Sequence, residues 1–160
     1  MSIQTEKPEN TGNIPGGKGY FDLLRTFLNR EDKFAASIGA RIVEISSGYA
    51  RAEMEITEQH LNGAKVVQGG AIFTLADFAF AGGSNSYGPR STAMNASITF
   101  MRPGTGKKLI AEARAVNRGR RTCLFDVTIS NDQGKNIAKM MINGFLFEGE
   151  SVLGEKNGIS

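Results

Sequence analysis

Apolar and polar residues follow two different periods along this chain, and the change between them marks its first structural boundary. From Tyr20 to Asn29, large apolar residues recur at intervals of three and four, which predicts an amphipathic helix. From Tyr49 to Thr57, apolar and mostly charged residues alternate, which predicts an antiparallel strand with one buried face. Arg41–Ile45 precedes this strand across a short Ser-Ser-Gly connection and is its expected hairpin partner.

The second half of the chain predicts four further strands, which are separated by turns rich in glycine, proline and asparagine. They span Thr92–Met101, Leu109–Asn117, Thr122–Ser130 and Asn136–Phe147. Before them lies an apolar run that predicts a helix, with Gly69–Gly70 at its start and Gly82–Gly83 at its end. Because this helix is apolar on nearly every side, the sheet is expected to enclose it. The predicted fold class is α+β, with an antiparallel sheet wrapped around one long buried central helix.

The chain is long enough for one globular domain with a substantial core, since it has 160 residues of which 40% are hydrophobic. Residues 1–19 are rich in glycine, proline and charge and are expected to form a flexible leader. Residues 150–160 are expected to form a similar tail. A single domain over residues 20–149 is predicted between them.

Composition and charge exclude several classes of function. The formal charge of +3 is spread over scattered basic residues, so nucleic-acid binding is not indicated. No stretch approaches the roughly 20 apolar residues of a membrane span, and no secretory signal is visible. One histidine and one cysteine are too few for a zinc site, and the lone Cys123 agrees with a reducing cytoplasm. We therefore expect a cytoplasmic protein whose chemistry needs no metal and no cofactor.

Asp77 is the only charged residue between Lys65 and Arg90, and it lies inside the predicted buried helix. An unpaired carboxylate inside a protein either costs folding free energy or takes up a proton through a raised pKa. Folding alone therefore gives little reason for an aspartate here, and a chemical role is the sharper hypothesis. The alternative is a carboxylate that is satisfied by backbone donors or faces a water-filled groove.

The two glycines at the helix start provide complementary chemistry. Backbone N–H groups at a helix N-terminus have no partner within the helix, and the helix dipole there favours negative charge. Glycine also lets a ligand approach the backbone closely. Gly69 and Gly70 could therefore stabilise negative charge that develops on a ligand, although a plain helix start would use the same residues.

A motif in the chain joins Asn62, the glycine pair and Asp77. Six residues separate Asn62 from Gly69–Gly70, and six more separate this glycine pair from Asp77. This spacing, Asn-x(6)-Gly-Gly-x(6)-Asp, resembles the signature of hotdog-fold acyl-CoA thioesterases, in particular of their phenylacetate-pathway-type (PaaI-like) branch. The resemblance continues through Asn85–Gly88, Ile98–Pro103 and the Arg118–Thr122 turn, and it covers most of residues 34–147.

By this resemblance, Asp77 is the acidic catalytic residue and acts as a general base on water or as the nucleophile. Gly69 supplies the N–H that polarises the thioester carbonyl, and Asn62 lies beside the substrate and the attacking water. The resemblance implies an acyl-CoA thioesterase that releases a free acid and CoA, with medium-chain or aromatic acyl groups favoured.

Further residues are candidate substrate contacts: Gln68, Gly70, His60, Thr92, Arg118, Arg120 and Arg121. Gln68 stands where the family has a histidine, and it can donate a hydrogen bond but cannot titrate near neutral pH. His60 either shapes the site or is an exposed loop residue. The arginines either bind an anionic ligand or form a solvated hairpin turn. Phe73, Phe78 and Phe80 are candidates for lining an apolar acyl tunnel.

Helix geometry separates the two main catalytic candidates. Gly69 and Asp77 are eight residues apart, which is roughly 12 Å along one helix. A single thioester carbon must approach both groups within about 3–3.5 Å. One chain cannot meet this requirement, so if both residues take part, the site must combine Gly69 of one subunit with Asp77 of another. The resemblance implies the same: homodimers with a continuous sheet and two shared sites, which are expected to pair into tetramers.

Departures from the family pattern leave a second hypothesis open. Besides the glutamine, the hydroxyl that relatives place near the acid falls at Ala81 or Ala93 here, and Thr92 and Thr74 are the nearest substitutes. The second hypothesis is a non-catalytic acyl-CoA-binding module. A third, a hotdog hydratase, requires an Asp/His pair, and His60 precedes the helix in the wrong register.

Overall fold

The computed structural model describes residues 15–154, so most of the predicted leader and tail lies outside the described residues. In chain order its elements are α1 (Lys18–Glu31), α2 (Lys33–Ser37), β1 (Arg41–Ser46), β2 (Tyr49–Glu55), the 3-10 turn η2 (Glu58–His60), α3 (Gly69–Asn85), β3 (Arg90–Phe100), β4 (Lys108–Arg118), β5 (Thr122–Asn131) and β6 (Asn136–Phe147). None of the helices in residues 15–154 is long and apolar enough to cross a membrane.

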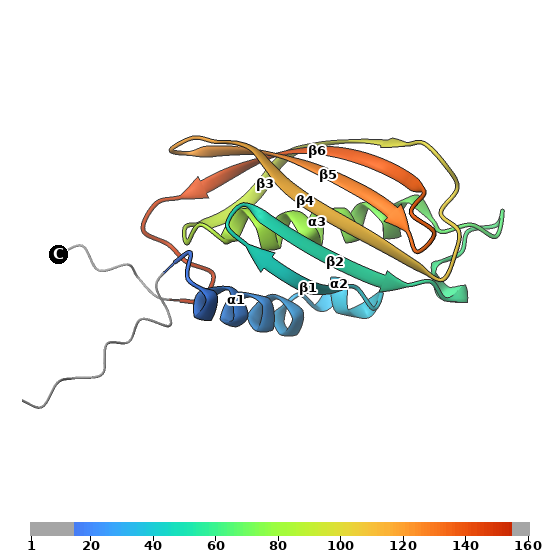
Figure 1. The fold of residues 1–160 in the computed structure, drawn as a ribbon, viewed down its shortest axis with the longest axis horizontal. Helices are drawn as coiled ribbons and strands as arrows, with labels where there is room; N and C mark the ends of the chain where they lie inside the picture. Colours follow the sequence, from blue (N-terminus) through green and yellow to red (C-terminus); the bar gives the residue numbers. More distant parts are fainter. Residues whose placement is uncertain (1–14, 155–160) are drawn as a thin grey trace, which may run out of the picture.

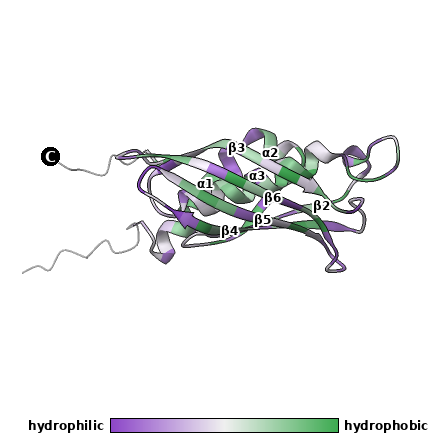
Figure 2. Ribbon diagram, turned by 90° about the horizontal axis from the view of Figure 1, so that it is seen from above, coloured by the Kyte–Doolittle hydropathy of each residue, from purple (hydrophilic) through white to green (hydrophobic). Residues whose placement is uncertain are grey.

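The strands form one antiparallel sheet in the order β1-β2-β4-β5-β6-β3. α3 packs against one face of this sheet, and α1 lies beside β1 (Figure 1). Apolar and polar residues alternate along the strands (Figure 2), and the apolar ones form the core beneath α3. Ala50, Ala52, Ala111 and Ala113 are fully buried on β2 and β4, so the helix backbone approaches the sheet closely there. The predicted α+β fold with an antiparallel sheet and a long central helix is confirmed.

The end of α3 differs from the prediction. The helix continues through Gly82 and Gly83 to Asn85, so these glycines do not terminate it. A Cβ atom at position 82 would lie 2.7 Å from the Cβ atom of Ala50, and one at position 83 would lie 2.7 Å from Cε1 of Phe125. Both glycines are therefore required by close contact with the sheet rather than by the helix end.

The expectation that the sheet encloses α3 on every side is wrong. The residues of α3 that face the sheet are buried, but Gly70, Phe73, Thr74, Asp77 and Ala81 form a stripe that is exposed or half-buried. Their spacing of three and four residues places them on one side of the helix. Because this stripe includes phenylalanine and alanine, the sequence analysis predicted that it would be buried.

The two edges of the sheet differ in whether another part of the chain covers them. At β1, the side-chain amide of Asn29 on α1 donates to the carbonyl oxygen of Ile42 (2.9 Å) and accepts from its N–H (2.8 Å). At the other edge, no strand of the described chain pairs with the outer side of β3. β3 carries a bulge between Ala93 and Asn95, and Met94 at this bulge is 54% exposed. An edge of this length is a ready template for pairing with another strand.

Two short elements were missing from the sequence-based prediction. α2 has five residues and begins at Asp32, whose carboxylate accepts from the N–H of Ala35 at 2.9 Å. η2 has three residues and is closed by His60. Elements this short contain no full apolar period, so periodicity does not detect them.

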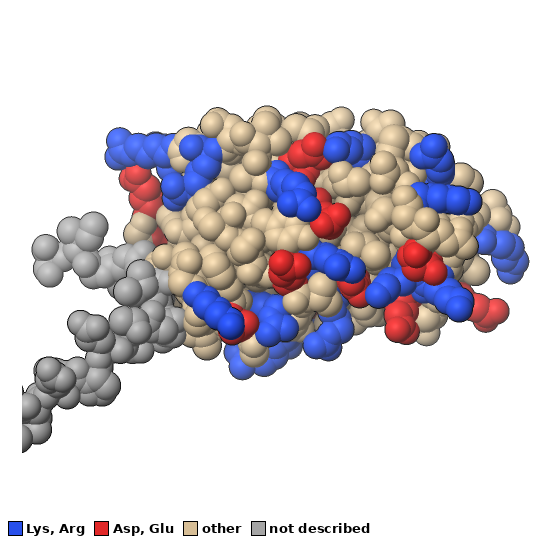
Figure 3. All heavy atoms as spheres, in the orientation of Figure 1, with Lys and Arg blue, Asp and Glu red and all other residues tan. Residues whose placement is uncertain are grey.

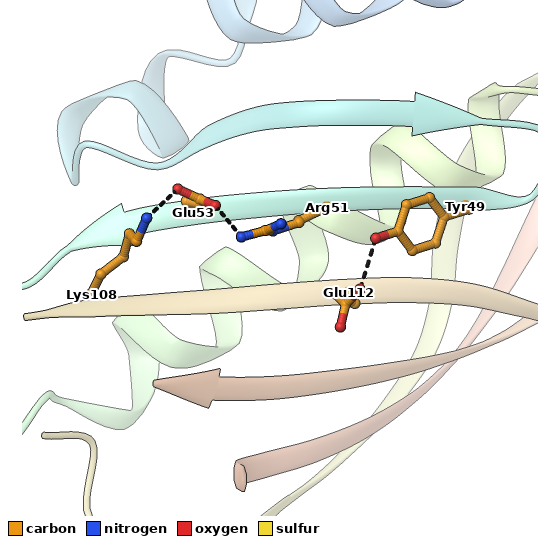
Figure 4. A network of polar contacts seen from close by, with 5 residues as sticks. All are labelled: Tyr49, Arg51, Glu53, Lys108 and Glu112. Atoms are coloured by element: carbon orange, nitrogen blue, oxygen red, sulfur yellow. Dashed lines mark hydrogen bonds and ion pairs between the residues drawn. The ribbon is translucent and has the colours of Figure 1, made fainter. Parts of the chain in front are cut away.

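The outer face of the sheet carries a network of polar side chains on β2 and β4 (Figure 4). Glu53 accepts from Arg51 at 2.6 Å and from Lys108 at 2.8 Å. Tyr49 donates to Glu112 at 2.7 Å, and burial, followed by this hydrogen bond, raises the pKa of Tyr49 to about 12. Charges of both signs are interspersed over this face (Figure 3), so its ion pairs are local and mutually compensating.

Candidate active site

The N-terminus of α3 presents one backbone donor that has no acceptor. Gln68 is the N-cap residue, and its side-chain oxygen accepts from the N–H of Gly70. The N–H of Gly69 has no acceptor among the described residues. A Cβ atom at position 69 would lie 3.1 Å from Cζ of Phe100, so glycine lets this aromatic ring lie against the helix start. Of the two glycine donors, Gly69 is thus the one available to a ligand.

One of the two polar groups of the Gln68 side chain already has a hydrogen-bond partner. Its oxygen satisfies the helix N-terminus, a role that is typical of N-cap side chains, while its Nε2 group has no acceptor in residues 15–154. A histidine at this position could cap the helix through only one ring nitrogen. Gln68 therefore keeps an available amide donor beside Gly69, although it lacks a titratable group.

Asn62 organises the loop that leads into α3. Its Oδ1 accepts from the N–H of Ala64 at 2.9 Å and of Val66 at 3.4 Å. Lys65 within this loop has a φ of 62°, in the left-handed region. The Asn62 side chain is exposed, and its Nδ2 group has no acceptor among the described residues. In this structure Asn62 shapes the turn through its oxygen and offers its NH₂ group to the exterior.

His60 is buried, at 7% exposed, so the expectation of an exposed loop histidine is wrong. Its Nδ1 accepts from the N–H of Thr57 at 3.0 Å, which assigns the ring proton to Nε2. Nε2 then donates to the carbonyl oxygen of Ile38 at 2.7 Å. Both ring nitrogens are therefore engaged in tying η2 to the segment after α2, and neither is free for a substrate.

Asp77 lies half-buried on the exposed stripe of α3. Its carboxylate has no hydrogen-bond donor and no cation among the described residues, so the backbone-satisfied alternative does not describe it. Burial, and secondarily the negative charge of Asp32, raises the pKa of Asp77 above its ordinary value. An unpaired carboxylate with a raised pKa is a stronger base than an ordinary aspartate, which suits proton transfer.

Within one chain, Gly69 and Asp77 do not meet. They lie on the same side of α3, eight residues or roughly 12 Å apart along its axis. Each α3 therefore presents an anion-stabilising donor at one point of its exposed face and a carboxylate at another. This arrangement can serve one carbonyl only if a second copy of the face supplies the missing half.

Comparisons with known proteins identify the family of this chain. Residues 64–138 match the family model described as "Thioesterase superfamily". The chain is 38% identical over 125 residues to the Escherichia coli acyl-coenzyme A thioesterase PaaI, covering 78% of this chain and 84% of that protein. Superposition on the structure of E. coli PaaI gives a TM-score of 0.78 with 32% identity, over 82% of this chain and 96% of the other. The chain belongs to the thioesterase superfamily, in its PaaI-like hotdog branch.

The chain is also similar to two further proteins. A putative esterase of Archaeoglobus fulgidus is 42% identical over 116 residues, or 72% of this chain and 75% of the relative. A Streptococcus mutans protein solved bound to acetyl CoA has a TM-score of 0.65 and 28% identity, over 68% of this chain and 89% of that one. As a member of this family, the PaaI-like thioesterase described here is a thioester hydrolase.

Thr74 and Thr92, the predicted substitutes for the hydroxyl that relatives place near the acid, differ in whether their hydroxyl groups already have a hydrogen-bond partner. Thr74 donates its hydroxyl to the carbonyl oxygen of Gly70 at 2.8 Å, so it is used within the helix. Thr92 is exposed on β3, and its hydroxyl has no partner among the described residues. Sequence reasoning missed the hydroxyls of the buried Ser84 and the half-buried Ser91, which form a hydrogen bond of 2.5 Å between α3 and β3.

The arginine turn lies at the other end of the thioesterase from Gly69 (Figure 1). Arg118 stacks over the ring of Tyr87, with 4.5 Å between its Cζ and the ring centroid. Arg120 is paired with Glu148 at 2.7 Å, and Arg121 forms no ion pair within residues 15–154, although its charge contributes to lowering the pKa of Glu148. The structure therefore does not bring these arginines together with Gly69 or Asn62 inside one chain.

The sequence analysis also did not predict a groove that lies beside the N-terminus of α3. It has a volume of about 440 Å³ and is lined mainly by apolar residues, including Val66, Ile72, Phe100 and Met101 around Gly69. Its sequence signal was the Ile98–Pro103 segment, which belongs to the family resemblance. By contrast, Phe78 and Phe80 are buried in the core, so they do not line a tunnel in this chain.

Proposed function

We propose that this protein hydrolyses an acyl-CoA to a free acid and CoA, at sites that combine Gly69 of one subunit with Asp77 of another. The observation that carries the proposal is the pair of unsatisfied groups on one face of α3. These are the N–H of Gly69, which has no acceptor, and the carboxylate of Asp77, which has no donor, within the described chain. The names of the E. coli relative and of the acetyl CoA complex support the choice of substrate.

The reaction follows from the chemistry of these two groups. Acting as a base, the Asp77 carboxylate takes a proton from water while the water oxygen bonds to the thioester carbon. The carbonyl oxygen becomes an oxyanion that accepts from the N–H of Gly69 at the positive end of α3. Collapse of this intermediate breaks the C–S bond, and the CoA thiolate takes up the proton. In the alternative route, Asp77 attacks the carbon itself, the C–S bond breaks and the CoA thiolate leaves with a proton from solvent, and water then hydrolyses the mixed anhydride to the free acid and the restored carboxylate.

The groove beside Gly69 supports an apolar acyl group. Its lining by Val66, Ile72, Phe100 and Met101 suits a medium-chain or aromatic group better than a charged one. Nearby, the free amide groups of Asn62 and Gln68 can donate to the carbonyl region or to the attacking water. Thr92 on β3 offers a further hydroxyl that can contact the substrate.

The open edge of β3 supports a homodimer with one continuous sheet. Antiparallel pairing of two β3 strands brings the exposed stripe of each α3 toward its copy, as the split catalytic groups require. Arg118 and Arg121, which form no ion pair in the described chain, are then available to the CoA phosphates. Arg120 can join them on breaking its exposed ion pair with Glu148, which contributes little. Pairing of dimers into tetramers is part of the proposal.

The decisive assay presents the protein with a panel of short, medium and aromatic acyl-CoAs and traps the free thiol that is released. We expect thiol release from at least one medium-chain or aromatic member, together with the matching free acid. No release above background across the panel would sink the proposal.

A non-catalytic acyl-CoA-binding module is the second candidate. It is favoured by Gln68, whose oxygen is committed to Gly70, and by the alanines at positions 81 and 93 where relatives carry a hydroxyl. Titration calorimetry with CoA and with acyl-CoA distinguishes the two functions, because a binding module would show saturable heat without thiol release.

A further inference from the structure

One aromatic residue lies between the two halves of the site on each helix. Residues 69, 73 and 77 follow one another at intervals of four, so each is rotated only about 40° from the next around the axis of α3. Phe73 thus stands midway between the Gly69 donor and the Asp77 carboxylate, on the same face. It is 37% exposed, whereas Phe78 and Phe80 on the same helix are 2% and 3% exposed. Phe73 is therefore the large apolar side chain that this face of α3 offers to a partner.

Symmetry determines what this ring faces in a dimer. If Gly69 of one subunit meets the Asp77 of the second, a twofold axis requires that Asp77 of the first meets Gly69 of the second. The two α3 helices then run antiparallel, and residues whose numbers add up to 146 oppose each other across the interface. Phe73 is the residue for which this rule gives its own copy. Each active site then lies roughly 6 Å along the helix from that point, on either side of it.

The two sheet edges independently select a second copy of this chain as the occupant of the exposed face. The β1 edge is covered by α1, where Asn29 occupies both backbone groups of Ile42. The β3 edge carries no partner in the described chain, and Met94 and Phe100 on it are 54% and 51% exposed. Pairing of β3 with its copy covers this edge and continues the sheet.

We propose that the Phe73 rings of two subunits pack against each other on the twofold axis and form the wall that separates the two active sites. Phe73 is then a specificity-determining residue, because an acyl group that extends from the carbonyl toward the axis meets this ring pair. The proposal rests on the proposed function, since the position of the axis follows from pairing Gly69 with Asp77.

Cross-linking tests the axis without any need for turnover. We would replace Phe73 by cysteine in the full chain, treat the protein with a short bis-maleimide, and measure the covalent dimer on a denaturing gel. The matched control is Phe34→Cys, since Phe34 is 68% exposed and lies on α2 rather than on α3. The only native cysteine, Cys123, is 2% exposed, so the unchanged protein gives the background.

We expect the Phe73→Cys protein to cross-link to its own copy at least about tenfold more than the Phe34→Cys protein, because proximity raises the effective concentration. Equal cross-linking of the two variants would overturn the axis position, and so would a chain that is monomeric by light scattering. An unchanged protein that fails to hydrolyse the acyl-CoA panel would refute the proposed function, while the cross-linking result would still report on the axis.

The wall is tested by Phe73→Ala with the same panel and with Phe34→Ala as control. We expect the ratio of kcat/KM for the longest or bulkiest acyl-CoA to that for the shortest one to rise about tenfold in Phe73→Ala only. An unchanged ratio in a variant that remains dimeric would show that acyl groups do not extend toward Phe73, and the wall would be abandoned.

Discussion

Asn29 and Ile42 are joined by two hydrogen bonds that imitate a strand pair. The amide of Asn29 on α1 occupies both the N–H and the carbonyl group of Ile42 on β1, at 2.8 and 2.9 Å. These bonds satisfy the backbone at an irregular point of β1, where its register with β2 shifts between Ile42 and Glu44. One edge of the sheet is therefore blocked within the chain, which leaves β3 as the edge for association.

Replacing Asn29 by alanine should lower the free energy of unfolding by about 1–3 kcal/mol, because both backbone groups of Ile42 lose their partner. Urea denaturation monitored by circular dichroism measures the change. The control is Asn117→Ala, since Asn117 is exposed near the end of β4 and its side chain makes no bond within residues 15–154. Equal effects of the two substitutions would show that the Asn29 bonds contribute nothing specific.

Gly83 should tolerate no side chain although it lies inside a helix. Alanine is the better helix former, but its Cβ atom would lie 2.7 Å from Cε1 of the buried Phe125. We expect Gly83→Ala to lower the free energy of unfolding by about 1–3 kcal/mol, as overpacking does. Gly63→Ala, where a Cβ atom meets nothing within 4 Å, should change it by less than about 0.5 kcal/mol. If Gly83→Ala instead stabilised the protein, the contact with Phe125 would not be the reason for a glycine at this position.

Asp77→Asn should keep the fold and the association state while it lowers turnover by about two or more orders of magnitude, the range for a lost base or nucleophile. Asparagine has nearly the same volume and removes only the charge. The control is Asp22→Asn on α1, because Asp22 is exposed and its one ion pair, with Arg25, has a long 3.4 Å contact. Turnover that is unchanged in Asp77→Asn would remove this residue from the mechanism.

The raised pKa of Asp77 predicts two pH dependences of opposite sign. Activity should rise with pH through this raised value, which lies above the ordinary 3.8, because the carboxylate must be ionised to act. Stability should change the other way. A group whose pKa is higher in the folded state holds its proton more tightly there, so its contribution to stability falls as pH rises through the interval above 3.8.

Both dependences can be measured on the same proteins. The pH profile of kcat/KM gives the acid limb, and urea unfolding at several pH values gives the difference in stability between Asp77→Asn and the unchanged protein. This difference should grow in favour of the asparagine variant as pH rises through the same interval. A difference that is constant with pH would mean that the pKa of Asp77 is the same in the folded and unfolded states.

Shared sites predict complementation between inactive variants. Asp77→Asn removes the carboxylate, and Asn62→Ala damages the turn beside Gly69, whose N–H groups at Ala64 and Val66 lose their acceptor. A mixed dimer holds one site with both lesions and one with neither. After co-refolding, about half of the dimers are mixed, which gives roughly a quarter of the original activity per subunit. Activity no higher than the parental mean, with mixed dimers present, would show that the site lies within one subunit or that Asn62 acts on the same side as Asp77.

Much of the fold could be predicted from the sequence because its elements have strong periods. Alternation over β2 placed Ala50, Ala52 and Met54 on the buried face, and β6 spans the predicted range Asn136–Phe147. Alternation forces every second side chain of a strand into the same environment, so the pattern is legible without the rest of the chain. The position of Asp77 on a helix, and its separation from Gly69, likewise follow from counting residues.

Only the tertiary structure decided which side of α3 is open and which polar groups are already used. Apolar residues such as Phe73 and Phe78 look alike in the sequence, yet one is exposed and the other is buried, because burial depends on where the sheet ends. In the same way, His60 and the oxygen of Gln68 are committed to backbone groups that no spacing rule identifies. Local periods are properties of single segments, whereas exposure and hydrogen-bond partners are set by contacts between distant ones.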